Sequence, residues 1–159
     1  MIITEAKQTD IKEITTLFYE TIQEINSKDY PKDEIDDWSS WREDVDRWAE
    51  EIEKFYFIVA KIDSKIVGIA SLASDGYLDL LFVHKDFQRN GVAKSLLSEI
   101  EKKASEQQND LIYSDVSITA KVFFEKYGFK VEKQQMKKSK EKELINFKMT
   151  KKLTNNNAW

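Results

Sequence analysis

The segment Leu80–Ala93 carries the clearest chemical pattern in the chain. An apolar stretch ends at Val83, a polar loop follows, and the small residues Gly91 and Ala93 flank the start of a predicted helix. The first turn of a helix leaves backbone N–H groups unpaired, and the helix dipole is positive there. Small residues let an anion reach these groups, so the segment predicts a phosphate-binding site. An ordinary helix start that needs a small residue remains the alternative on this pattern alone.

Two basic residues, Arg89 and Lys94, add positive charge beside this helix start in a chain whose net charge is −4. Other phosphate-binding patterns are missing. The sequence has no Gly-x-x-x-x-Gly-Lys-Ser/Thr loop and no Gly-x-Gly-x-x-Gly near its N-terminus. These absences exclude the P-loop and dinucleotide-binding classes.

A carboxylate interrupts the apolar stretch that leads into the loop. Asp79 lies within Tyr77–Val83, where every other residue is apolar or aromatic. A buried carboxylate is costly unless it has a partner or a chemical role, so Asp79 is the best candidate for a catalytic base. The alternative is an Asp that pairs with a lysine for structural reasons. Tyr77 lies two residues away on the same face of a strand and is a candidate for binding substrate.

Cysteine is absent and His84 is the only histidine. The sequence therefore has no thiolate nucleophile and no cysteine-ligated zinc, and we expect no metal site. His84 directly follows the apolar stretch, and we interpret it as a residue without a chemical role.

The composition fits one soluble globular domain, with 159 residues of which 41% are hydrophobic and 34% charged. The acidic balance argues against a nucleic-acid surface. No apolar run approaches the ~18 residues that would span a membrane, and the N-terminus shows no secretory signal. We expect a cytoplasmic protein with neither a nucleic-acid nor a membrane partner.

Hydrophobic periodicity predicts an α/β domain. Strands are expected near residues 2–6, 55–61, 65–72, 77–83, 111–116, 129–135 and 144–150. Helices are expected from about 10 to 25, 33 to 53, 92 to 107 and 120 to 127. Residues 153–159 are polar apart from their ends and are expected to form a disordered tail.

The strand-loop-helix segment resembles motif A of the GNAT-type N-acetyltransferases. Ile66–Ala70 resembles the third strand of that family, and Ala120–Phe129 resembles its motif B. Ser117–Ala120 suggests a subgroup of bacterial acetyltransferases with Ser-Ile-Thr-Ala before the last helix. The resemblance covers residues 1–152 and implies a single domain with the GNAT acyl-CoA N-acyltransferase fold. That fold is a mixed, mostly antiparallel seven-stranded sheet flanked by four helices.

The resemblance implies acetyl-CoA as cosubstrate, with no metal. Strand backbone at Leu81, Phe82 and Val83 is expected to hold the pantetheine arm. The residues expected at the pyrophosphate are Gln88, Arg89, Asn90, Gly91, Val92, Ala93 and Lys94. Ser117 and Phe124 are also expected to contact the cofactor.

The implied reaction is direct attack of an amine on the acetyl thioester, for which a base must take a proton. Many family members use a tyrosine in the motif B helix as an acid, but the matching position here is Phe124. Tyr127 lies one helical turn later and is the candidate acid, with a packing role as the alternative. The substitution at Phe124 leaves a second hypothesis open, a non-catalytic acyl-CoA-binding or protein-interaction module.

The helices that precede the central strands are expected to roof the acceptor site. We select Tyr19, Tyr30 and Trp38, together with Tyr77, as acceptor-binding residues, although the tryptophan spacing equally suits a core face. The acceptor is expected to be a small-molecule or peptide amine. The sequence leaves monomer and homodimer open.

Overall fold

The computed structural model describes residues 1–153. Over this range the chain forms seven strands and five α-helices. In chain order these are β1 (Ile2–Glu5), α1 (Ile11–Glu24), α2 (Lys32–Ser39), α3 (Val45–Lys54), β2 (Tyr56–Ile62), β3 (Lys65–Leu72), β4 (Leu78–Val83), α4 (Val92–Glu106), β5 (Leu111–Ser117), α5 (Lys121–Lys126), β6 (Lys130–Lys138) and β7 (Glu143–Lys152). The predicted α/β class with mostly antiparallel strands is confirmed.

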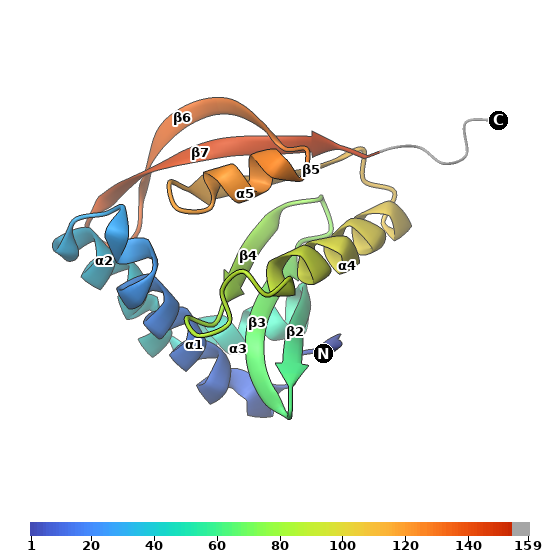
Figure 1. The fold of residues 1–159 in the computed structure, drawn as a ribbon, viewed down its shortest axis with the longest axis horizontal. Helices are drawn as coiled ribbons and strands as arrows, with labels where there is room; N and C mark the ends of the chain where they lie inside the picture. Colours follow the sequence, from blue (N-terminus) through green and yellow to red (C-terminus); the bar gives the residue numbers. More distant parts are fainter. Residues whose placement is uncertain (154–159) are drawn as a thin grey trace.

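The strands form two antiparallel sheets rather than one continuous ladder. The first has the order β1-β2-β3-β4, and the second has the order β5-β7-β6. A single parallel bridge, from Tyr77 to Tyr113, joins them where β4 and β5 begin. Figure 1 shows the second sheet and α5 set apart from the first sheet. The first sheet has α4 on one side and α1 to α3 on the other.

The helix predicted over residues 33–53 is interrupted, so the domain has five α-helices where four were expected. A 3-10 turn over Ser40–Glu43 separates α2 from α3, and Asp44 leaves the helical region at ψ 71°. The Asp44 side chain accepts the Arg47 N–H at 3.3 Å and caps α3. The Trp41 carbonyl accepts both the Asp44 N–H at 3.1 Å and the Trp48 indole N–H at 2.9 Å. The apolar stripe would suit one continuous helix over residues 33–53, but these local hydrogen bonds favour the break.

Two hydrophobic clusters hold the first sheet between its helices. One cluster contains the inner face of α4, and the other contains the inner faces of α1, α2 and α3. At Gly68 on β3 an added Cβ would lie 2.7 Å from a Val92 methyl group and 2.8 Å from a Leu96 methyl group. Gly68 therefore lets α4 pack directly against the sheet, which fixes the start of α4 close to the end of β4.

The predicted tail falls almost wholly outside the described residues. Its first residue, Leu153, is described, and its N–H donates to the Asp110 carbonyl at 2.9 Å. Among the described helices, none combines the length and apolar character that a bilayer crossing requires.

Candidate active site

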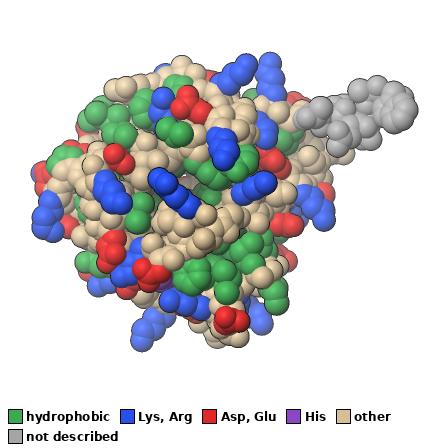
Figure 2. Space-filling view, viewed as in Figure 1, with side chains coloured by type: hydrophobic (Ala, Val, Ile, Leu, Met, Phe, Trp, Pro, Cys, Tyr) green, Lys and Arg blue, Asp and Glu red, His purple; other side chains and the backbone are tan. Residues whose placement is uncertain are grey.

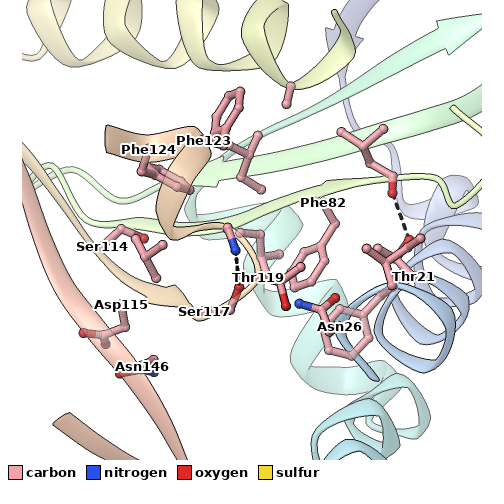
Figure 3. A pocket seen from close by; sticks show the side chains of 18 of the residues that line it. Thr21, Asn26, Phe82, Ser114, Asp115, Ser117, Thr119, Phe123, Phe124 and Asn146 are labelled. Carbon is pink, nitrogen blue, oxygen red and sulfur yellow. Dashed lines mark hydrogen bonds between the residues drawn. The ribbon is translucent and has the colours of Figure 1, made fainter. Parts of the chain in front are cut away.

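A cavity of about 1270 Å³ lies where β4 and β5 separate. Its walls come from both strands, the start of α4, α5 and the helices α1 to α3. Figure 3 shows side chains from these separate elements meeting in it, including Phe82, Asp115 and Phe124. Lys and Arg side chains are spread over the face seen in Figure 2. The basic residues that line the cavity are Lys28, Arg47, Lys85, Arg89, Lys94, Lys126, Lys137 and Lys138.

The edge of β4 faces this cavity because β5 does not pair with it. Beyond the Tyr77 bridge, the Ser114 hydroxyl donates to the Leu78 carbonyl at 2.7 Å, and no further β4–β5 pairing occurs in residues 1–153. On its other edge β4 pairs with β3, and the His84 N–H continues that ladder to the Val67 carbonyl. Backbone groups alternate between the two edges of a strand, so Leu81 and Val83 direct theirs toward the cavity.

The loop after β4 is fastened back to the strand. Gln88 donates its side-chain amide to the Val83 carbonyl at 2.7 Å, and that carbonyl also accepts the Thr21 hydroxyl at 3.0 Å. Gly91 then begins α4 with φ 80°, and no atom lies within 4 Å of the place where its Cβ would be. The first N–H groups of this 15-residue helix therefore border open space.

His84 has a structural role in the same loop. Its Nδ1 accepts the Asp86 N–H at 3.0 Å, and its ring packs edge-on against Phe87. Burial lowers the pKa of His84, so the ring is neutral at physiological pH and Nδ1 is free to accept. This geometry supports the interpretation that His84 has no chemical role.

Asp79 lies at a β-bulge. Ser71 is opposite Leu80 and Leu72 is opposite Leu78, so Asp79 is the extra residue of β4. Its side chain lines the cavity. Tyr77 also lines it, and its hydroxyl donates to Asp115 at 3.1 Å. Burial, followed by the negative charges of Asp79 and Asp115, raises the pKa of Tyr77, which stays a neutral donor.

The α5 end of the cavity is largely aromatic. Phe124 is buried against Phe129, and no proton donor replaces it at that position of the helix. Tyr127 lines the cavity and packs against Phe123 with ring centroids 4.8 Å apart. Its catalytic role stays a prediction.

Polar groups between β5 and α5 complete this wall. Ser117 accepts the Ala120 N–H at 3.1 Å, so it takes part in the turn that begins α5. The hydroxyl oxygen of Thr119 is buried and has no hydrogen-bond partner within the described chain. Figure 3 places Thr119 close to Asn26 and Phe82, facing the cavity. A buried hydroxyl without a partner fits a wall that holds a polar ligand.

The residues predicted to bind the acceptor differ in where they lie. Trp38 lines the cavity and packs against Phe82 with centroids 6.0 Å apart. Tyr30 also borders it, but its hydroxyl donates to the Ile145 carbonyl at 2.6 Å and accepts the Ile118 N–H at 2.9 Å. Burial raises the pKa of Tyr30, and its hydroxyl braces β7 against the start of α5.

Two predicted residues lie outside the cavity lining. Tyr19 follows the buried Phe18 on α1, and the Arg42 guanidinium lies 3.8 Å from its ring centroid. Its predicted contact with the acceptor stays a prediction. Asn90 is exposed in the loop. The remaining predicted site residues all line the cavity.

Glu51 on α3 also lines the cavity and was missed in the sequence. Its carboxylate accepts the hydroxyl of the buried Ser71 at 3.3 Å and lies within hydrogen-bond reach of Asp79. A signal was present, because Glu51 follows Trp48 by three residues and so lies on the apolar face of its helix. Within residues 1–153, no group of three or more His, Asp or Glu side chains is arranged so that it could hold a metal ion.

Comparisons with known proteins agree on one family. Residues 26–153 match the family model of the acetyltransferase (GNAT) domain. The uncharacterized N-acetyltransferase YafP of Escherichia coli (strain K12) is 36% identical over 126 residues, which cover 79% of each chain. A GCN5-related N-acetyltransferase from Rhodopseudomonas palustris superposes with a TM-score of 0.93 at 25% identity, over 96% of this chain and 95% of the other. The chain belongs to the GNAT N-acetyltransferases, which are acyltransferases.

Replacing Tyr30 with Phe tests its bracing role. We expect Tyr30→Phe to lower the free energy of unfolding by about 1–3 kcal/mol, because the Ile118 N–H and the Ile145 carbonyl lose their partner in a partly buried place. Urea denaturation monitored by tryptophan fluorescence measures this. Tyr19→Phe is the matched control and should change stability by less than about 0.5 kcal/mol. Equal stabilities of the two variants would contradict the bracing role.

Proposed function

We propose that this chain transfers the acetyl group of acetyl-CoA to a primary amine of a small molecule or peptide, by direct attack in a ternary complex. The observation that carries the proposal is the open edge of β4, which leads from Asp79 to the start of α4. One continuous wall thus offers a carboxylate, strand backbone and a helix N-terminus in sequence. These are the groups needed by an amine, by an extended amide chain and by a diphosphate.

The strand edge suits the pantetheine arm. An extended ligand with amide groups adds to an open edge as a further strand would, and Leu81 and Val83 supply the backbone groups. Phe82 lines the same wall. Two similar structures give support: PaiA N-acetyltransferase from Thermoplasma acidophilum, solved with coenzyme A (TM-score 0.80, 22% identity), and yncA from Salmonella typhimurium, solved with acetyl-CoA (TM-score 0.67, 18% identity).

The loop before α4 suits the diphosphate. Gly91 leaves the first helical N–H groups uncovered, and Arg89 and Lys94 bring positive charge to the same wall. A helix start of this kind favours a phosphate both by hydrogen bonding and by its dipole. Gln88 shapes the loop through its bond to Val83.

The reaction needs a base beside the amine. As the amine nitrogen forms a bond to the acetyl carbon, the carbon–sulfur bond breaks and the sulfur leaves with the electron pair. Asp79 takes the proton that the nitrogen loses. A thiol has a pKa of about 8.5, so the leaving sulfur needs little assistance. Tyr127 is the proposed donor where an acid is used, since Phe124 has no proton to give.

Binding of CoA is tested at Gly91. Gly91→Glu places a carboxylate where the diphosphate would lie, and we expect the affinity for CoA in isothermal titration calorimetry to fall more than about tenfold, or about 1.4 kcal/mol. Gly91→Ala is the control for backbone strain, because both variants must adopt φ 80°. Its affinity should stay within a few-fold of wild type. Normal binding by a folded Gly91→Glu variant would contradict this assignment of the loop.

Turnover is tested with acetyl-CoA and a panel of primary amines, by following release of the CoA thiol. We expect Asp79→Asn to lower kcat/KM by about 10²-fold or more, because the amide cannot take a proton, while CoA affinity is unchanged. Asp63→Asn, in the exposed β2–β3 turn, is the matched control. Tight CoA binding with no turnover of any amine would instead favour a non-catalytic acyl-CoA-binding module.

A further inference from the structure

The acceptor end of the cavity contains two carboxyl groups in contact. Glu51 comes from α3 and Asp79 from the bulge of β4, and both line the cavity. They lie within hydrogen-bond reach of each other. The hydroxyl of Ser71 on β3 donates to Glu51 from the other side at 3.3 Å. Three elements therefore hold the two groups together.

No cation neutralises this pair directly. The ion pairs formed within residues 1–153 include neither Glu51 nor Asp79. Arg47 lies one turn earlier on α3 and attracts Glu51, but its guanidinium is stacked 4.0 Å from the centroid of the Trp41 ring. Tyr77, which is neutral, and the Asp115 carboxylate, which accepts the Tyr77 hydroxyl at 3.1 Å, line the same cavity and supply no positive charge. Two adjacent carboxylates without a counterion cannot both be ionised at low cost.

We propose that Glu51 and Asp79 share one proton at neutral pH, so that the pair carries one negative charge. Glu51 is then the positioning residue that orients the Asp79 carboxylate toward the acceptor amine. The inference rests on the proposed function, since Asp79 is the base there. Burial, followed by the hydrogen bond and the negative charge of Asp79, raises the pKa of Glu51 to about 9, which agrees with a retained proton.

The shared proton completes the balance of the transfer. The acceptor binds with its nitrogen neutral, having released one proton to solvent, and one N–H donates to the Asp79 carboxylate while Glu51 donates to the same carboxylate. When the N–C bond forms and the C–S bond breaks, the surplus proton of the nitrogen moves to Asp79. The pair then holds two protons, and one passes through water to the leaving sulfur, which becomes the thiol. The pair returns to its singly protonated form.

This arrangement predicts an alkaline limit to activity. Above about pH 9 the pair loses its shared proton, and Glu51 no longer donates to Asp79. An acceptor with an α-amine has a pKa of about 7.7–8.0, so the amine is already almost wholly deprotonated at pH 9. With such an acceptor, kcat/KM of the wild type should fall about tenfold for each pH unit above about 9.

Glu51→Gln separates this role from a merely structural one. The Gln amide still donates to Asp79 but cannot ionise, so kcat/KM should stay level between about pH 8.5 and 10. Glu51→Ala lacks the donor and should have a lower kcat/KM than Glu51→Gln throughout. Glu50→Gln, at the exposed neighbouring position, should keep the wild-type profile. An alkaline limb that persists in Glu51→Gln would overturn the inference.

A second readout does not depend on turnover. Carbon-13 NMR of the side-chain carboxyl groups in the full chain should show one Glu that titrates near pH 9 in the wild type and in Glu50→Gln. Its signal should be absent in Glu51→Gln. In Asp79→Asn its titration midpoint should move toward the ordinary glutamate pKa of about 4.3. If no carboxyl group of the wild type titrates above about pH 7, the proposal of a shared proton is overturned. Failure of every amine to react would count against the proposed function while leaving this result intact.

Discussion

The separation of β4 from β5 is the constraint on which the rest of the site depends. The two strands begin side by side at the Tyr77–Tyr113 bridge and then diverge into different sheets. Buried backbone groups need partners, and an unpaired strand edge inside a domain is costly. The chain compensates only in part: Thr21 and Gln88 satisfy the Val83 carbonyl, and much of the remaining edge faces the cavity. An edge left open in this way is suited to an extended ligand, which would supply the missing hydrogen bonds.

The cavity also brings groups of both charges to its wall. Arg89, Lys94 and the first N–H groups of α4 lie at the α4 end, where a diphosphate is proposed to bind, while the other basic residues come from separate elements of the wall. Glu51 and Asp79 line the cavity from α3 and β4, at the end where the acceptor is proposed to bind. Keeping Glu51 protonated also has a cost for the fold. At pH values between the ordinary glutamate pKa and about 9, the folded chain retains a proton that the unfolded chain releases, so this group lowers stability as pH rises.

Local sequence patterns predicted the α/β class, the strand-loop-helix segment and the position of Asp79 well, because periodicity and the small residues before α4 are local signals. They gave less where particular hydrogen bonds or contacts between elements decide the outcome. The interruption at Asp44 depends on a cap and on the Trp48–Trp41 hydrogen bond. Tyr19 was selected by its residue type, and no local pattern announces that the Arg42 guanidinium stacks on its ring. Glu51 was missed because its importance arises only when α3 packs on the sheet, where Glu51 meets Ser71 and Asp79.

A crystal structure with bound CoA tests the central claim most directly, because the claim is that the open edge of β4 receives the cosubstrate. We expect the pantetheine amides to be hydrogen-bonded to the backbone of Leu81 and Val83, the diphosphate to lie at the N–H groups that follow Gly91, and the sulfur to lie at the Asp79 end of the strand. CoA bound on another face of the molecule, with the β4 edge left uncontacted, would contradict the account.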